Sequence, residues 1–273
     1  MNYSNPIVLK FHYIENITDF IRATFIPICN ILKNSLSDSM FHISSTDYKT
    51  IIITFFIRNQ DVDAIIHKLQ LFMYKNISEL NLNKIEVPCK KSVLTNNCQE
   101  DCMMTKLLCQ CSEHIVGMTL NKNATENARV AFAIAILIQL GRSFYVSISG
   151  FQKNISRILS LQIPKSISNY TKTLLNHNII LNVENKLMSE YEKIYAKNLN
   201  TIYANYYDMI HSKNKENYEY DFYDTYWLQC NKQHRNKIFR QYADLLLNTC
   251  LIPSFYRAFI PFCISKLFNE NEI

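Results

Sequence analysis

The chain has 273 residues, of which 48% are hydrophobic and 19% charged, a composition that excludes an intrinsically disordered protein. Only three glycines are present, which argues against the glycine-rich phosphate loops of nucleotide-binding proteins and kinases. The net charge of +6 permits an acidic peptide or an RNA partner but requires neither.

The amino-terminal part alternates between strand and helix patterns. Period-two runs rich in β-branched and aromatic residues predict strands, and apolar residues at helical spacing predict helices between them. The expected elements are a strand at Ile7–Ile14, a helix over Phe20–Leu32, a hairpin of Met40–Ser44 and Thr50–Arg58, a helix at Asp61–Lys75 and a short strand at Ile85–Val87. This β-α-β-β-α-β order predicts a ferredoxin-like half over residues 1–92.

From Cys98 onward the pattern is almost entirely helical, so we expect an α+β protein whose second part, residues 93–273, completes one compact domain and lines an active-site cavity. Gly141 is the expected end of one helix. The expected elements are Ala124–Leu140, a short strand leading into a helix within Phe144–Leu161, then Ile167–Asn176, Val183–Ile210, Asn231–Leu251 and Ser254–Phe268, with a folded-back loop or lid at Tyr218–Leu228.

The sequence favours a cytoplasmic protein. The longest nearly unbroken apolar run, Val130 to Leu140, has eleven residues including Gln139, whereas a membrane-spanning helix needs about 20. The amino terminus lacks the basic and apolar regions of a signal peptide. Nine cysteines, an odd number, are scattered through apolar patterns and indicate reduced thiols.

Four cysteines, Cys98, Cys102, Cys109 and Cys111, fall close together on a predicted helix. Their spacing does not form the paired short knuckles of a zinc site, and cysteine is among the most buried residue types. We therefore favour core packing and expect no metal and no cofactor.

Ser112, Glu113 and His114 form the clearest polar cluster, but adjacent residues on a helix spread over about 200° and cannot converge on one atom. One of them facing a cleft is as plausible as a polar edge on a packed helix. For His12 and His42, each within a predicted strand, a structural role is favoured over catalysis.

A second polar cluster, Ser254, Tyr256 and Arg257, follows Pro253 at the expected start of the last helix. The start of a helix offers free backbone N–H groups, so this cluster is a candidate for binding an anion or a carbonyl oxygen. The 17 tyrosines are interpreted mainly as helix-packing residues, with stacking on bases or thiazole rings as the alternative.

Three short sequence motifs and one helix pattern resemble those of a known family. Met40–Phe55 reads MFHISSTDYKTIIITF, Thr105–Ser112 reads TKLLCQCS and Cys250–Phe259 reads CLIPSFYRAF, while Arg129–Gly141 fits a helix that begins near an arginine and ends in Leu-Gly. The pattern resembles, over its whole length, the elimination domain of class I lanthipeptide dehydratases in the stand-alone form found in thiopeptide clusters.

Several residues that the eliminating members of this family use are absent here, and this narrows the expected reaction. The hairpin arginines that hold a glutamyl ester in the eliminating enzymes are replaced by residues such as Ser44 and Thr54, and the late histidine becomes Pro253 or Ser254. The family's RYGG phrase is also missing. The resemblance therefore implies a thiopeptide pyridine synthase, which joins two dehydroalanines of a modified precursor peptide by a formal [4+2] aza-cycloaddition and releases water and the leader peptide.

By this resemblance the partner is a modified precursor peptide, no nucleic acid or membrane is involved, and a homodimer is left open. We expect Ser112 and Tyr256 to donate hydrogen bonds to a carbonyl, and His114 to shuttle a proton. Arg257, Ser254 and Glu113 are the expected substrate-binding residues, and the leader is expected on the amino-terminal sheet. The alternatives are a non-catalytic leader-binding adaptor and a split glutamate-elimination subunit.

Overall fold

The computed structural model describes residues 4–12, 16–32, 36–47, 50–57, 62–75, 82–86, 98–121, 126–145, 147–170, 177–211 and 230–269. The chain divides into two compact units. The first contains Met1–Ala124 together with Asn248–Leu251, and the second contains Thr125–Leu247 together with Ile252–Ile273. The boundary predicted after residue 92 falls inside the first unit, because helix α4 (Cys98–Leu120) packs against the sheet of that unit.

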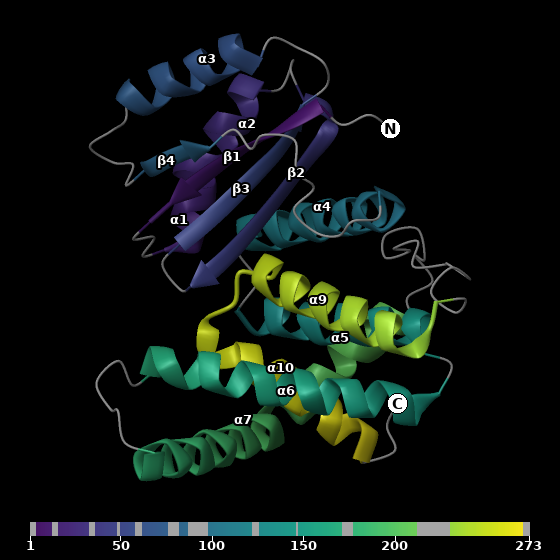
Figure 1. The fold of residues 1–273 in the computed structure, drawn as a ribbon. Helices are drawn as coiled ribbons and strands as arrows, with labels where there is room; N and C mark the ends of the chain where they lie inside the picture. Colours follow the sequence, from purple (N-terminus) through teal and green to yellow (C-terminus); the bar gives the residue numbers. More distant parts are fainter. Residues whose placement is uncertain are drawn as a thin grey trace. The chain divides into compact units, whose positions relative to one another are not determined.

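The first unit is built on a four-stranded antiparallel sheet, with β1 (Ser4–Phe11), β2 (Leu36–Asp47), β3 (Thr50–Ile57) and β4 (Leu82–Glu86) in the order β2-β3-β1-β4 (Figure 1). Leu9 lies opposite Ile53, which in turn lies opposite Ile43. All three side chains are completely buried, because successive strands present them on the same face of the sheet. The strands predicted for this part of the chain are confirmed.

Helices cover the apolar face of this sheet (Figure 1). They are α1 (Ile17–Phe20), η1 (Ile21–Phe25), α2 (Ile26–Leu32) and α3 (Val62–Lys75). Asn16 caps α1, since its side-chain oxygen accepts the N–H groups of Thr18 at 2.9 Å and Asp19 at 3.3 Å. Pro27 lies in the first turn of α2, directly after the π turn of η1.

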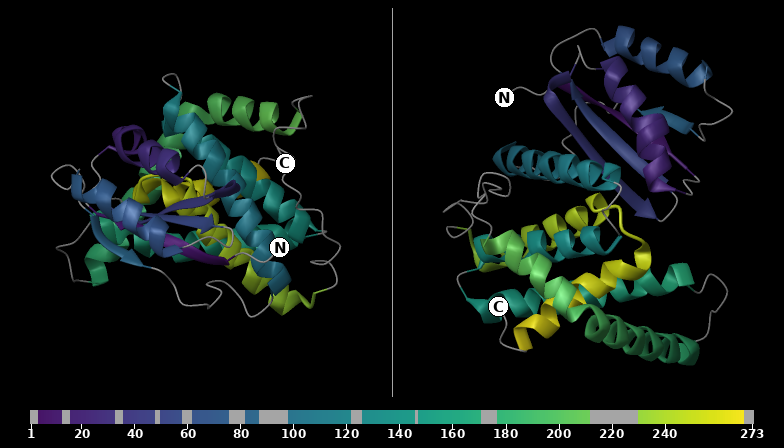
Figure 2. Two further views of the ribbon diagram at one scale, coloured as in Figure 1. Left: turned by 90° about the horizontal axis from the view of Figure 1, so that it is seen from above. Right: turned by 180° about the vertical axis from the view of Figure 1, so that it is seen from behind.

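The second unit contains α5 (Glu126–Phe144), α6 (Ile148–Tyr170), α7 (His177–His211), α10 (Ser254–Asn269) and α9 (Lys232–Thr249) up to Leu247. Helix α10 contacts α5, α6 and α7, and the views of Figures 1 and 2 agree on this arrangement. Helix α5 is apolar on every side because it is buried over most of its length. In the described part of the chain, no helix is long and apolar enough to cross a membrane.

Two boundary predictions are wrong. Helix α5 does not stop at Gly141 but continues to Phe144, and Gly141 is needed for space: a Cβ there would lie 2.2 Å from the ring of Phe151. The segment before α6 forms no strand in its described residues, and α6 continues through Pro164 to Tyr170. The expected lid at Tyr218–Leu228 lies outside the described residues.

The four residues Asn248–Leu251, which are the last two of α9 and the first two of its connection to α10, belong to the first unit. Within that unit Thr249 is completely buried, and its hydroxyl lies 2.9 Å from Nε2 of His42 on β2. Leu251 is also buried and has a φ of 49°, a conformation that is costly for a branched side chain. The fold therefore holds this connection in a fixed, strained turn.

Candidate functional site

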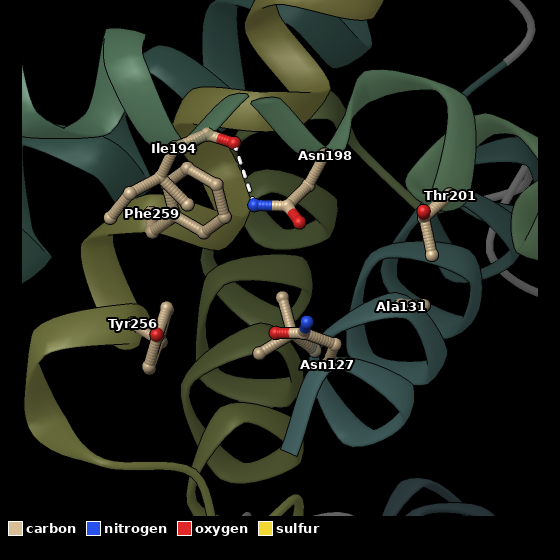
Figure 3. A pocket seen from close by; sticks show the side chains of 8 residues that line it. Asn127, Ala131, Ile194, Asn198, Thr201, Tyr256 and Phe259 are labelled. Carbon is tan, nitrogen blue, oxygen red and sulfur yellow. Dashed lines mark hydrogen bonds between the residues drawn. The ribbon is translucent and has the colours of Figure 1, made fainter. Parts of the chain in front are cut away.

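A pocket in the second unit is lined by three helices (Figure 3). It is a shallow hollow: most of its empty volume of about 320 Å³ is open to solvent, and only a small part is enclosed between the helices. The lining side chains are Asn127, Val130 and Ala131 from α5, Ile194, Asn198 and Thr201 from α7, and Tyr256 and Phe259 from α10. The pocket thus combines an apolar wall with amide and hydroxyl groups.

Tyr256 is the one predicted site residue among those described around this pocket. It lies in the first turn of α10, where its backbone N–H donates to the carbonyl of Pro253 at 2.9 Å. Burial raises the pKa of its phenol, and the nearby carboxylate of Glu126 raises it further. The phenol is therefore protonated at neutral pH and can donate a hydrogen bond.

Asn198 supplies an acceptor to the same pocket. Its side-chain nitrogen donates to the carbonyl of Ile194 at 2.9 Å, which leaves the side-chain oxygen toward the pocket (Figure 3). Asn127 and Thr201 are exposed at the pocket. Donors and acceptors next to an apolar wall are the groups that an amide of a peptide requires.

Tyr191 of α7, whose side chain is completely buried, contacts the first turn of α10. The hydroxyl of Tyr191 donates to the carbonyl of Phe255, and burial raises the pKa of this phenol well above its usual value. The ring of Tyr191 also meets those of Phe255 and Phe259, with centroids 5.1 and 5.3 Å apart. These contacts fix the turn that carries Tyr256.

Ser254 and Arg257 share this first turn of α10 with Tyr256. Ser254 is the first residue of the helix, and its side chain lies outside the described structure. Arg257 is only 5% exposed and is not among the described residues that line the pocket. Their predicted contacts with substrate stay predictions.

Ser112, Glu113 and His114 lie on α4 in the first unit. Ser112 is completely buried, and its hydroxyl accepts the N–H of Ile43 at 3.0 Å and donates to the carbonyl of Leu108 at 2.6 Å. Glu113 is exposed and His114 is half-buried, and partial burial raises the pKa of Glu113 while His114 acts in the opposite direction. The contacts of Ser112 point to a structural task, and its predicted catalytic role stays a prediction.

The two expected structural histidines have hydrogen-bond partners. Besides the contact of His42 with Thr249, Nδ1 of His12 lies 3.3 Å from the hydroxyl of Thr50. Burial lowers the pKa of His42 to about 4, so this ring is neutral at pH 7.

The cysteines are consistent with core packing as far as they are described. Cys109 and Cys111 are buried, and burial raises the pKa of Cys109 to about 12. The side chains of Cys98 and Cys102 lie outside the described structure. Within the described residues, no group of three or more potential ligands could hold a metal ion.

The sequence did not single out Asn127, Asn198 or Thr201. Asn198 follows Ile194 by four residues, a spacing that places both on one side of α7, but nothing local indicates which helices this side meets. The pocket depends on contacts between segments more than 50 residues apart in the chain, as its lining shows.

No family model and no curated protein matches the sequence. Among solved structures, the fold is similar to that of the pyridine synthase TbtD from thiomuracin biosynthesis, with a TM-score of 0.54 over 98% of this chain and 98% of that chain. The sequence identity between the two is 8%, so the likeness shows a shared α+β, mostly helical fold and no more.

Proposed function

We propose that this protein is a pyridine synthase that joins two dehydroalanines of a modified, ribosomally made precursor peptide by a formal [4+2] aza-cycloaddition, with loss of water and of the leader peptide. The observation that carries the proposal is the likeness of fold to TbtD over nearly the full length of both chains. The pocket beside Tyr256 supports it, because a peptide amide fits the groups found there.

The reaction requires the protein mainly to position the reacting groups of the substrate and to form hydrogen bonds with them. Holding two alkenes close together converts a bimolecular step into an effectively unimolecular one. One amide must also become its imidic acid tautomer, which a donor to its carbonyl oxygen promotes. We assign this donor role to Tyr256, whose raised pKa keeps the phenol protonated.

The remaining assignments follow from the same hypothesis. Ser112 is a second candidate donor, His114 a candidate proton shuttle, and Glu113, Ser254 and Arg257 are candidate substrate contacts. We also propose that the first unit is a ferredoxin-like module, supported by its antiparallel strand order β2-β3-β1-β4 and by the helices between its strands.

Replacing one phenol tests the assignment of Tyr256. Turnover of a leader-bearing peptide with two dehydroalanines is expected to fall about 100-fold in Tyr256→Phe, the usual effect of removing one donor to a reacting oxygen. The matched control is Tyr74→Phe, because Tyr74 lies on α3 and is 78% exposed. Full turnover by Tyr256→Phe would remove this residue from the mechanism.

A further inference from the structure

The two helices α6 and α9 carry an excess of positive charge. Together they carry seven Lys and Arg residues and one acidic residue, Asp244. Their net charge of +6, with histidines neutral, equals that of the whole chain. The rest of the sequence is balanced, so this excess belongs to one region of the second unit.

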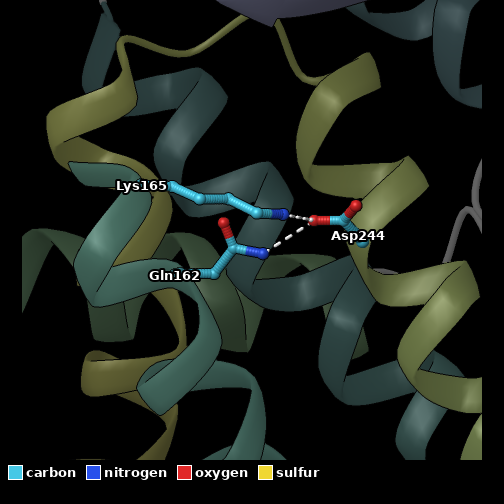
Figure 4. Close-up of polar contacts among 3 residues, drawn as sticks. All are labelled: Gln162, Lys165 and Asp244. Atoms are coloured by element: carbon cyan, nitrogen blue, oxygen red, sulfur yellow. Dashed lines mark hydrogen bonds and ion pairs between the residues drawn. The ribbon is translucent and has the colours of Figure 1, made fainter. Parts of the chain in front are cut away.

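At one end of this helix pair the charge is neutralised (Figure 4). Asp244 of α9 accepts from Lys165 and from Gln162 of α6, each at 2.7 Å. Arg157 of α6 and Arg235 and Arg240 of α9 lie nearer the start of each helix than this contact. None of these three arginines has a carboxylate partner among the residues that the structure describes.

A hydrogen-bonded centre formed by Tyr145 and Asn236 lies near the three arginines. The phenol of Tyr145 donates to the side-chain oxygen of Asn236 at 2.9 Å. Nε of Arg240 donates to the backbone carbonyl of the same Asn236 at 3.0 Å. Burial raises the pKa of Tyr145, and the charges of Arg235, Arg240 and Arg157 act in the opposite direction, as expected for guanidinium groups near the phenol.

Arg235 has hydrogen-bonding capacity that the described protein does not use. Its Nε is buried and has no hydrogen-bond partner among the described residues. Such a donor is costly to leave unsatisfied, and more so when it carries charge. A ligand oxygen at this position would satisfy it.

The basic residues near the start of α9 also destabilise this helix. This helix has no acidic residue in its first turn, where negative charge is favourable, but has Lys232 and then Arg235 near its start. Among the described residues, Asn231 caps the backbone, and its side-chain oxygen accepts the N–H of His234 at 2.9 Å. A bound anion would offset this unfavourable distribution of charge.

We propose that Arg157, Arg235 and Arg240 form a binding site for a glutamate- or aspartate-rich segment of a peptide. Guanidinium groups match carboxylates with two parallel hydrogen bonds, so a cluster of three arginines fits neighbouring acidic side chains. The inference rests on the proposed function in that it takes the segment to belong to the precursor peptide.

The aromatic rings at this site favour a peptide over RNA. Tyr145 stacks on Phe151, and its ring also meets that of Phe239 edge to face, with centroids 6.2 and 5.2 Å apart. Phe151 and Phe239 are buried, so they offer no open face to a nucleobase. Stacking on exposed rings is the usual means of binding single strands.

Fluorescence anisotropy with a labelled ten-residue oligoglutamate peptide tests the site in the full-length protein. We expect Arg235→Gln to weaken binding about tenfold, the loss of one charge-assisted contact. Lys237→Gln, the matched control, should change affinity less than about twofold, because Lys237 is exposed and lies about 200° around the same helix. Arg157→Gln should weaken binding as Arg235→Gln does.

Three results would overturn the proposal: no binding of oligoglutamate, equal weakening by Arg235→Gln and Lys237→Gln, or tighter binding of a single-stranded RNA of the same length. The Tyr256→Phe variant should bind oligoglutamate like the wild type. If oligoglutamate binds through the arginines but the precursor is not converted, the proposed function is wrong and the binding site stands. If the precursor is converted but oligoglutamate does not bind through the arginines, the binding site is wrong and the proposed function stands.

Discussion

At the scale of single residues, the hydroxyl of Ser112 joins a helix to the edge of a sheet. It accepts the N–H of Ile43, and β2 is an outer strand whose N–H groups on that side have no neighbouring strand in the described sheet. Ser112→Ala should therefore lower the free energy of unfolding by about 1–3 kcal/mol, the cost of leaving a buried N–H without a partner.

A matched serine separates this effect from the loss of any serine hydroxyl. Ser156 also donates to the carbonyl four residues earlier, at 3.0 Å, but is exposed. In urea unfolding, Ser156→Ala should change stability by less than about 0.5 kcal/mol. If both variants have the same stability, the bond to Ile43 contributes nothing.

His42 predicts a pH dependence of stability. Its pKa in the folded protein is about 4, below the usual 6.5 of a free histidine, so the unfolded chain binds the proton more readily. The stability is complete above pH 6.5 and is lost as the pH falls toward 4, by up to about 3 kcal/mol. Carboxylates also titrate in this range, so the wild type must be compared with His42→Gln at pH 7 and pH 5. The wild type should lose more stability between these pH values, and an equal loss would contradict the assignment.

Among the helices, Gly141 and Gly117 differ in whether there is space for a Cβ atom, so their replacement by alanine should have opposite effects on stability. A Cβ on Gly141 would meet the ring of Phe151 at 2.2 Å, and this ring is confined by Phe239 and Phe268. Gly141→Ala should destabilise the protein by about 1–3 kcal/mol through overpacking. A Cβ on Gly117 would have no described atom within 4 Å, so Gly117→Ala should stabilise α4 by about 0.5–1 kcal/mol. Thermal unfolding of the two variants checks both signs, and shifts in the same direction would contradict this account.

The same glycine shows what the sequence could and could not predict. Periodicity identifies most of the helices and strands, because it reflects which side of each element is buried, but it divides the single helix α6 into separate elements. Local propensity predicts a helix end at Gly141, because glycine is common just after helices. It carries no information about Phe151, whose ring packs against Gly141 from the next helix. The pocket is similar: Tyr256 was a candidate from its place near a helix start, whereas Asn127 and Asn198 became recognisable only once α5, α7 and α10 were placed together.

At the scale of the whole molecule, the predicted site residues are divided between the two units. Ser112, Glu113 and His114 belong to the unit with the sheet, and Ser254, Tyr256 and Arg257 belong to the helical unit. The pocket and the arginine cluster both lie in the helical unit, on different sets of helices. The two proposed sites, for the reacting amide and for the acidic segment of the peptide, therefore lie in the same unit.

Mass spectrometry can show whether this chain joins two dehydroalanines. The purified protein is incubated with a leader-bearing thiazole peptide that contains two dehydroalanines, and the products are weighed. We expect a macrocyclic pyridine product and the released leader, with no cofactor added. Binding of this peptide without any product would contradict the claim and favour an adaptor that presents the peptide to other enzymes.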